Sequence, residues 1–328
     1  MNILFLTERS DNNVGVLNYH GLEMAVGEIA ECKWAGSGWT LHKNGESVTD
    51  TVKRVMPDAD WVVCPRETLV DTTQSSFKTC IMVTDLHGKW NWGLNTPMQF
   101  AETLNKAGYD IIFSRYREVH GCNCNPHLFQ QILGNKFKWL PWSMDKDYYY
   151  RFKGDPEYDV LFLGSVHPNI YPLRHSIIAN LAEFCQKNKF NFHVSTGIGV
   201  PVWEAEIDQL EKKGYPVGMN YARLLGRSRV VIFGNSKFKY PLQKNFEVRA
   251  AGCLAMSNAP AGDEELGFKD GVDYVNIDTQ SWQAKLLYYL QNWDEGEKIA
   301  ERGRQLFLER HTHEVRAREL VEVLNNAD

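Results

Sequence analysis

The segment Asp159-Val-Leu-Phe-Leu-Gly164 is a short apolar run that ends on glycine, and a helical pattern over residues 172–188 follows it. The chain itself opens in the same way, because residues 2–6 read NILFL and lead into the polar loop TERSDNNVG. A short apolar run bounded by polar loops is typical of a buried parallel strand. The segment at residue 159 therefore begins a second series of strands and helices within one chain.

Strands and helices are predicted to alternate along both halves of the sequence. The first half has expected strands at 2–6, 32–35, 60–64, 79–85 and 109–113, and expected helices at 17–30, 47–56, 97–107 and 126–133. The second half has expected strands at 159–164, 190–195, 229–233, 253–257 and 274–277, and expected helices at 172–188, 203–213, 219–227 and 246–251. Three further helices are expected to begin at Ser281, at Asp294 (with Glu297 in a capping box) and at Thr312. This alternation predicts an α/β fold with two Rossmann-like domains, each a parallel sheet covered on both faces.

Residues 143–158 interrupt the alternation. They are polar and aromatic, include Gly154 and Pro156, and are interpreted as a linker. The predicted domains are therefore residues 1–142 and 159–310, with a last helix at 311–328 that packs back towards the first domain. In a two-domain α/β protein, ligands are expected in the cleft between the halves, at the carboxyl ends of the strands.

The composition is that of an ordinary globular protein. The chain has 328 residues, 43% of them hydrophobic, and a formal net charge of −5, which argues against binding bulk nucleic acid through a global basic field. No apolar stretch approaches the roughly 20 residues that a membrane span needs, and charge follows the opening apolar run at once, unlike a signal peptide. The seven cysteines have unrelated spacings. We expect a reduced, cytoplasmic, soluble protein.

Two common phosphate-binding motifs are missing from the sequence. The first strand is not followed by G-x-G-x-x-G, and Gly197-Ile-Gly199 is followed by Pro201 rather than by a third glycine. No G-x-x-x-x-G-K-[ST] occurs either. These absences argue against a nicotinamide-dependent enzyme and against a P-loop NTPase.

The stretch SKFKYPLQKNFEVRAAGCLAMS, residues 236–257, is the most informative part of the chain. It places four cations before and within a short helix whose expected N-cap is Asn245: Lys237, Lys239, Lys244 and Arg249. Cations and a helix N-terminus attract anions. Glu247, beside them, could accept hydrogen bonds from two ribose hydroxyls while the cations bind the phosphates. The alternative is a solvated charged loop in which Glu247 pairs with Arg249 or Lys244.

Three segments resemble the carboxyl half of glycosyltransferases of the GT-B fold: KNFEVRAAGCLAMS, GFKDGVDYVNI and IAERGRQLFLERHTHEVRARELVEVL. They are most similar to a branch known as spore-maturation-like glycosyltransferases, with its Arg-x-Phe-Glu, Ala-x-Gly and His-Thr-Tyr patterns. DVLFLGSVHPNIYPLR resembles the family's first strand of the second domain. The likeness covers about half of the chain, and the amino half matches mainly in architecture.

The resemblance implies a donor site in the second domain. Glu247 matches the glutamate that binds the nucleotide ribose, and Lys244 stands where the family usually has arginine. Gly164 and Ser165 match the tight turn near the donor phosphates. The remaining donor-binding candidates are Arg174, Asn245 and Phe246.

The sequence departs from the family pattern at two positions. Many relatives have a second glutamate eight residues before the ribose glutamate, where this chain has Lys239. The tyrosine of His-Thr-Tyr is His313 here, so no role is transferred to it.

The first domain is expected to hold the acceptor. Asp85 and His87 follow a strand, and His87 could take the proton of the acceptor hydroxyl while Asp85 orients its ring. The alternative is an ordinary surface-loop histidine. Further acceptor-side candidates are Trp90, Trp92, Glu8 and His20, although the two tryptophans are more often packing residues.

No metal site is predicted. Cys122, Cys124 and His127 lack a second ligand pair. Of the two Asp-x-Asp sequences, the one at residues 58–60 lies away from the expected cleft and the one at 145–147 lies in the predicted linker. No cofactor is expected, because the nucleotide-diphosphate sugar is a co-substrate and cations neutralise its phosphates.

Together these features predict a metal-independent, hexosyltransferase-like glycosyltransferase that moves a sugar from a nucleotide-diphosphate donor, such as a UDP-sugar, to an acceptor hydroxyl. The acceptor could be a glycan, a lipid-linked glycan, a protein or modified DNA. The alternatives are a nucleotide-sugar epimerase or hydrolase of the same fold, and a non-catalytic protein that binds nucleotides or carbohydrates. The oligomeric state does not follow from the sequence.

Overall fold

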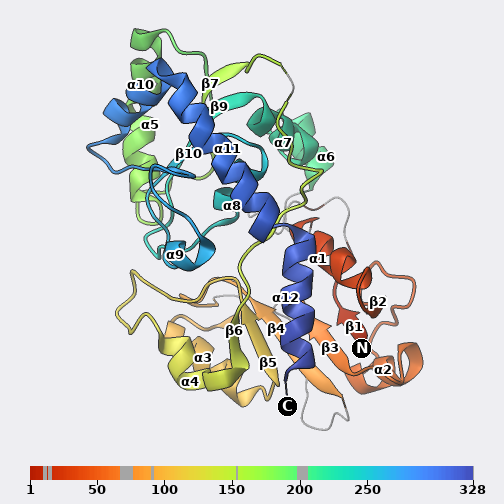
Figure 1. Ribbon diagram of the computed structural model, residues 1–328. Coiled ribbons are helices and arrows are strands. Elements are labelled where there is room, and N and C mark those ends of the chain that lie inside the picture. The colour runs from red at the N-terminus through yellow and green to blue at the C-terminus, as the bar shows by residue number, and fades with distance from the viewer. Residues whose placement is uncertain are drawn as a thin grey trace. The chain divides into compact units, whose positions relative to one another are not determined.

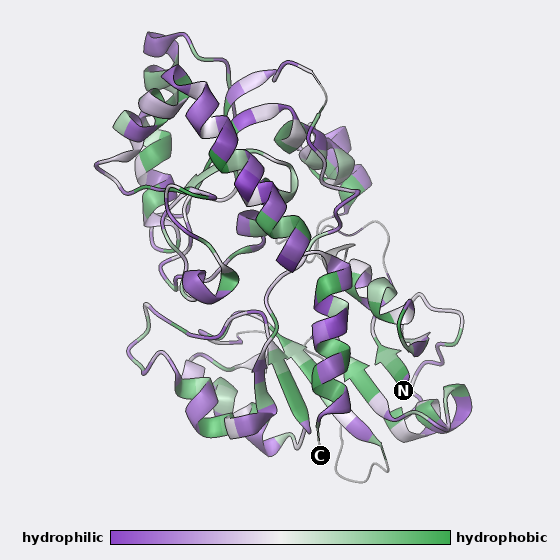
Figure 2. Cartoon of the chain, in the orientation of Figure 1, coloured by the Kyte–Doolittle hydropathy of each residue, from purple (hydrophilic) through white to green (hydrophobic). Residues whose placement is uncertain are grey.

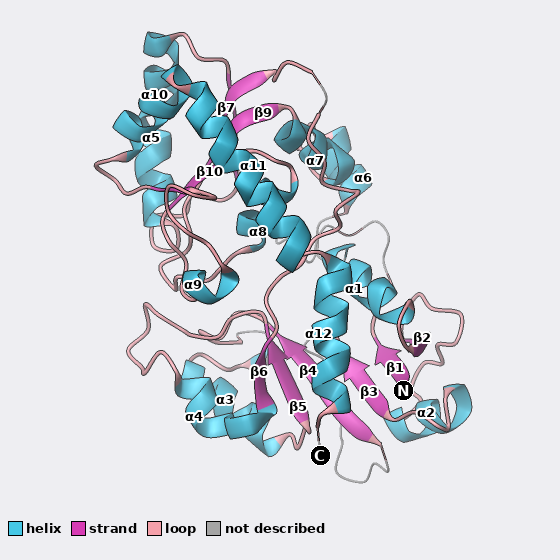
Figure 3. Ribbon diagram, in the orientation of Figure 1, coloured by secondary structure: helices cyan, strands magenta, loops and turns pink. Residues whose placement is uncertain are grey.

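The computed structural model describes residues 1–9, 13, 17–66, 77–89, 92–152, 154–197 and 206–327. The chain divides into two compact units. The first lies within Met1–Asp11, Val16–Pro141 and His313–Asp328, and the second within Asn12–Gly15 and Trp142–Thr312. The segment predicted as a linker, residues 143–158, is thus counted with the second unit. Both units are α/β structures (Figure 3).

The first unit is built on a six-stranded parallel sheet with the strand order β2-β1-β3-β4-β5-β6. Its strands are β1 (Asn2–Leu6), β2 (Glu31–Ala35), β3 (Trp61–Cys64), β4 (Lys78–Val83), β5 (Ile111–Ser114) and β6 (Phe137–Trp139). Its helices are α1 (Leu17–Gly27), α2 (Val48–Val55), α3 (Pro97–Lys106), α4 (Leu128–Leu133), the short 3-10 helix η2 (Gly134–Lys136) and α12 (His313–Asn325). Figure 2 shows that β3, β4 and β5 are largely hydrophobic, as strands buried on both faces must be.

Alternate residues of β1 face opposite sides of this sheet, and different helices cover the two sides. Ile3 and Phe5 join the core formed with α1 and α12, whereas Leu4 joins the core formed with α2. The last helix lies beside α1 (Figure 1) and contributes Ala317 and Leu320 to the first core. The end of the chain therefore completes the core of the unit that holds its beginning.

The second unit has a five-stranded parallel sheet with the order β11-β10-β9-β7-β8. Its strands are β7 (Tyr158–Leu163), β8 (Phe192–Ser195), β9 (Ser228–Ile232), β10 (Leu254–Ser257) and β11 (Val275–Asn276). Its helices are α5 (Pro172–Asn188), α6 (Ile207–Lys212), α7 (Gly218–Gly226), α8 (Gln243–Ala250), α9 (Asp263–Leu266), α10 (Trp282–Gln291) and α11 (Trp293–Arg310). Its main core joins one face of the sheet, including Phe162 and Ile232, to residues of α5, α10 and α11 such as Ile177, Leu286 and Ile299.

Most predicted elements are confirmed, with ends that shift by a few residues, but two predicted helix caps are wrong. Asn245 does not cap α8, because the helix begins at Gln243 after an extended Leu242, and the Asn245 side chain instead donates to the carbonyl of Leu242 at 3.1 Å. Helix α11, predicted to begin at Asp294, begins at Trp293, and its N-cap residue is Asn292. Glu297 makes no capping box there, because its carboxylate pairs with Arg151.

The predicted helix at 203–213 lies partly outside the described residues, within which α6 covers Ile207–Lys212. Among the described residues, no helix is both long enough and apolar enough to span a bilayer.

Candidate functional site

Several donor-side candidates of the second unit converge at the carboxyl edge of its sheet. Strands β7 and β9 pair in parallel, so the turn after β7, at Gly164, and the loop after β9, which leads into α8, lie at the same edge. A Cβ atom on Gly164 would lie 3.1 Å from Nη1 of Arg174 and 3.6 Å from Cε of Lys244. The structure therefore brings Gly164, Arg174 and Lys244 into contact.

Gly164 is needed at this turn for two reasons. Its φ of +115° is a backbone conformation that side chains rarely adopt. The approach of Arg174 also leaves little room for a side chain. Arg174 is 4% exposed, and its guanidinium donates to the carbonyls of Gly234 (2.6 Å) and Ser165 (3.2 Å). Burial lowers the pKa of Arg174 from its usual value, yet a guanidinium stays charged in proteins.

Lys244 and Glu247 stand three residues apart in α8, so their side chains share one side of the helix. Glu247 is buried, with 7% of its surface exposed, and both of its oxygens accept hydrogen bonds from phenols. Tyr221 of α7 donates to Oε2 at 2.6 Å, and Tyr149 donates to Oε1 at 3.3 Å. Lys244 Nζ in turn donates to the Tyr221 hydroxyl at 2.7 Å.

Burial and charge set the protonation of these groups. Burial raises the pKa of Tyr149 and of Tyr221 well above the usual value for a phenol, and the negative charge of Glu247 adds to this. Both hydroxyls therefore stay protonated at neutral pH. Burial lowers the pKa of Lys244 to about 8, with Glu247 acting in the opposite direction and Arg174 in the same direction. The site thus holds two cations around one carboxylate, which suits an anionic ligand with hydroxyl groups.

The other donor-side candidates are placed differently. Ser165 is exposed, and it meets Arg174 through its carbonyl. Phe246 is fully buried and packs against Phe268 and His311, so its side chain faces the core. Asn245 is 1% exposed and its amide donates to Asn235 at 2.8 Å, which makes it a support of the loop before α8.

The four cations of residues 236–257 do not form one patch. Arg249 is 2% exposed, pairs with Asp273 at 2.8 Å and lies 3.7 Å from the centre of the Phe268 ring, so it belongs to the interior. Lys237 and Lys239 are exposed on the loop before α8. The alternative in which Glu247 pairs directly with Arg249 or Lys244 is not observed among the described ion pairs, because Tyr221 stands between Lys244 and Glu247.

The acceptor-side candidates lie in the first unit, where Glu8 follows β1 and Asp85 and His87 follow β4, at the same edge of the parallel sheet. Asp85 is exposed with a φ of +32°, and His87 is half-buried. Glu8 pairs with Arg66 at 3.2 Å. His20 lies 3.2 Å from the carbonyl of Glu8 and stacks on Trp39, with the ring centres 5.8 Å apart.

Neither tryptophan candidate is seen as a sugar-binding surface among the described residues. Trp92 packs edge-on against Phe100, with the ring centres 5.7 Å apart, which fits the packing interpretation. Trp90 lies outside the described residues.

Acidic residues that could suggest a metal have structural partners instead. Asp58 and Asp60 accept hydrogen bonds from Asn2, and Asp145 accepts from the backbone of the following turn. Within the described parts of the chain, no three His, Cys, Asp or Glu side chains gather as a metal ion would require.

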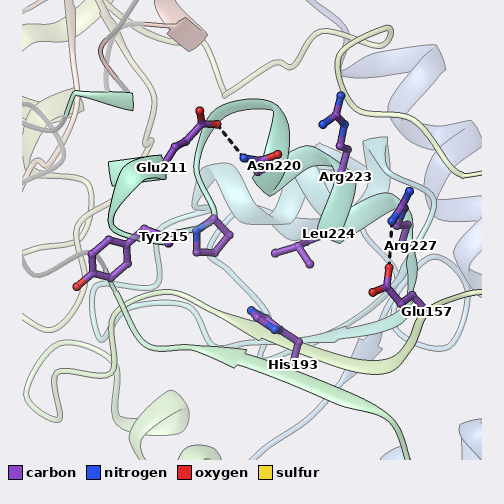
Figure 4. Close-up of a pocket in the computed structure, with 10 residues that line it drawn as sticks. Glu157, His193, Glu211, Tyr215, Asn220, Arg223, Leu224 and Arg227 are labelled. Atoms are coloured by element: carbon purple, nitrogen blue, oxygen red, sulfur yellow. Dashed lines mark hydrogen bonds and ion pairs between the residues drawn. The ribbon is translucent and has the colours of Figure 1, made fainter. Parts of the chain in front are cut away.

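A cavity of about 470 Å³ lies in the second unit between β8, α6 and α7 (Figure 4). Its walls come from His193, Tyr215 and one face of α7, with Asn220, Arg223, Leu224 and Arg227. None of the predicted donor residues lines it. Tyr221, which belongs to the same helix, does not line it either.

Sequence reasoning missed both phenols of this site. Tyr149 lies in the segment interpreted as a linker, and Tyr221 lies in an unremarkable amphipathic helix. They are 98 and 26 residues away from Glu247 in the chain, and no local motif marks either of them.

The two Rossmann-like units, with parallel sheets of six and five strands, define a GT-B fold. That is the fold of a class of glycosyltransferases. Residues 173–322 match the family model described as Glycosyl transferase-like. The resemblance drawn from the sequence is confirmed, while the narrower spore-maturation-like branch stays a prediction.

Solved structures share the fold over nearly the whole chain. A glycosyltransferase from Rickettsia africae is 12% identical, with a TM-score of 0.66, over 99% of this chain and 98% of its own. Anabaena HepE, solved with UDP and glucose, is 13% identical with a TM-score of 0.64 over 99% and 100%. An alpha-glucosyltransferase in complex with UDP and a 13-mer DNA is 10% identical with a TM-score of 0.61 over 99% and 100%. A search of the curated proteins finds no match.

Proposed function

We propose that this protein transfers a sugar from a nucleotide-diphosphate donor to an acceptor hydroxyl. The observation that carries the proposal is the arrangement in the second unit of a buried carboxylate, Glu247, beside two cations, Lys244 and Arg174, and the tight turn at Gly164. The carboxylate suits the vicinal hydroxyls of a ribose, and the cations suit a diphosphate. The family match and the UDP-bound structures of similar fold support this assignment.

In the proposed reaction, the bond between the anomeric carbon and the donor diphosphate breaks while a bond forms to the acceptor oxygen. The electron pair leaves with the diphosphate, where Lys244 and Arg174 stabilise the added charge. No metal ion is required in this proposal, because these cations and the Gly164 backbone neutralise the phosphates. The proton of the acceptor hydroxyl passes to a base of the first unit, for which His87, supported by Asp85, is the candidate.

Titration of the protein with UDP and with UDP-glucose by calorimetry tests the donor site. Charge-assisted hydrogen bonds contribute about 1.5–3 kcal/mol each, so Glu247→Gln is expected to weaken binding by about 10- to 100-fold. Glu183→Gln, an exposed carboxylate on α5 of the same unit, is the matched control and is expected to bind as the wild type does. Equal affinities for Glu247→Gln and the wild type would refute the donor-site assignment.

Product analysis separates the proposed reaction from its alternatives. Transfer requires that a glycosylated product appear only when an acceptor is present. Release of free sugar without acceptor, or an altered nucleotide sugar, would instead identify a hydrolase or an epimerase. Binding of the donor without any turnover would identify a non-catalytic protein. Activity that is lost in EDTA and restored by a divalent cation would contradict the metal-independent mechanism.

A further inference from the structure

The Tyr221 hydroxyl stands between the two charged groups of the proposed donor site. It lies 2.7 Å from Lys244 Nζ and 2.6 Å from Glu247 Oε2. An ammonium can only donate and a carboxylate can only accept, so the direction of both hydrogen bonds is determined. The Tyr221 proton points at Glu247, and a lone pair of its oxygen faces Lys244. One hydroxyl from α7 thus connects two side chains of α8.

In this arrangement, the hydrogen bonds from described residues leave positions on both charged groups at which a ligand can bind. A carboxylate has about four lone-pair sites, and here one phenol occupies each oxygen: Tyr221 on Oε2 and Tyr149 on Oε1. Each oxygen therefore keeps a position for one further donor, which matches a vicinal diol such as that of a ribose. The Lys244 ammonium has three N–H groups, of which Tyr221 accepts one. The others suit phosphate oxygens.

We propose that Tyr221 is a positioning residue that sets the spacing between a pentose-binding carboxylate, Glu247, and a phosphate-binding ammonium, Lys244. This inference rests on the proposed donor site and adds to it a residue that neither the family resemblance nor the spacing of the sequence indicates. Tyr221 acts through its two neighbours and contacts no substrate. The ligand class that matches both subsites at once is a nucleoside diphosphate.

The protonation of Lys244 provides a readout that a purely structural tyrosine would not affect. The groups that act on the ammonium are Glu247 on α8, Arg174 on α5 and Tyr221 on α7. Burial lowers the pKa of Lys244 to about 8, so affinity for a diphosphate is expected to fall as the pH rises above that value. Loss of the Tyr221 hydroxyl removes an acceptor that favours the charged form, so the fall should begin at a lower pH.

The experiment is calorimetric titration of the purified protein with UDP and with uridine between pH 6 and pH 9, for the wild type and Tyr221→Phe. Tyr221→Phe is expected to bind UDP about tenfold more weakly, to lose less affinity for uridine, and to show a lower pH midpoint. Glu247→Gln should also cost less in the Tyr221→Phe background than in the wild type, because the two residues act together. Tyr288→Phe is the matched control, since Tyr288 also donates to a glutamate, Glu295, at 3.0 Å on the surface of the same unit.

A second variant separates positioning of the lysine from support of the carboxylate. Tyr149→Phe removes the hydroxyl on Glu247 Oε1 and should weaken UDP binding without moving the pH midpoint, because Tyr149 has no hydrogen bond to Lys244 among the described residues. Equal midpoint shifts in the two variants would overturn the inference. A melting temperature of Tyr221→Phe more than about 10 °C below that of the wild type would favour a structural role and likewise overturn it.

The remaining outcomes separate this inference from the proposed function. Unchanged affinity and midpoint in Tyr221→Phe would show that Tyr221 does not position the pair. Tighter binding of UDP would show that the hydroxyl competes with the ligand for Glu247. A wild-type protein that binds no UDP, GDP, ADP or dTDP would refute the proposed donor site itself.

Discussion

Glu23 is expected to destabilise the first unit at neutral and alkaline pH. This residue of α1 is 1% exposed, and among the described residues neither carboxylate oxygen makes a hydrogen bond of good geometry. Burial raises the pKa of Glu23 from 4.5 to about 7, and the Trp34 indole, the Thr7 hydroxyl and the charges of Arg66 and Arg115 offset only part of this effect. Glu23→Gln removes the charge and keeps the shape of the side chain.

The sign of the effect follows from proton linkage. The folded state holds the proton of Glu23 up to about pH 7, whereas the unfolded chain loses it near pH 4.5. The free energy of unfolding of the wild type therefore falls between pH 4.5 and about pH 7 and stays at its lower value above pH 7. A shift from 4.5 to about 7 corresponds to about 3 kcal/mol as an upper value, since one pKa unit is about 1.4 kcal/mol. Glu23→Gln should gain up to this amount at pH 8 and nothing at pH 4.

Differential scanning calorimetry at pH 4, 6 and 8 measures the effect. For a unit of this size the gain corresponds to about 6–12 °C in the melting transition of the first unit at pH 8. Glu28→Gln, an exposed carboxylate just after the same helix, is the matched control and should leave the transition unchanged at every pH. A Glu23→Gln protein that melts at the wild-type temperature at pH 8, or a gain of equal size at pH 4, would refute the reasoning.

Two further predictions concern the second unit. Gly164→Ala places a Cβ atom 3.1 Å from Arg174 at a φ of +115°, so we expect a loss of about 1–2 kcal/mol of stability in thermal melts and weaker UDP binding. The control Gly214→Ala, at a φ of +79° with no atom within 4 Å, should lose stability without a change in UDP affinity. Arg249→Met leaves Asp273 buried without its partner and should cost about 3–5 kcal/mol in urea unfolding, whereas Arg227→Met breaks the exposed pair with Glu157 and should cost at most about 1 kcal/mol. Comparable losses for the two arginine variants would contradict the assignment of the Arg249–Asp273 pair to the interior.

Much of the fold could be predicted from local sequence patterns. Apolar runs such as those at β1 and β7, separated by amphipathic helices, are sufficient to predict two parallel sheets, because the burial of a strand or a helix face has a period that is visible within a few residues. The position of Glu247 in a short helix was also predicted, whereas Lys244, expected before that helix, lies inside it.

The N-cap errors show where local patterns stop being sufficient. Asn245 has a side chain that favours a cap, yet it lies inside α8, where its amide bonds to Asn235 on the preceding loop. Glu297 likewise pairs with Arg151, which is 146 residues away in the chain. A residue that favours a helix cap can be used elsewhere when tertiary packing offers its side chain another hydrogen-bond or ion-pair partner.

The sequence alone therefore determined the class of fold, the two halves and the short helix that carries Glu247, because each of these depends on residues close together in the chain. Only the tertiary structure decided that Arg249 is an interior residue and that Tyr149 and Tyr221 hold Glu247. Those contacts join residues far apart in sequence. They depend on how whole elements pack, and packing leaves no periodic signal in the chain.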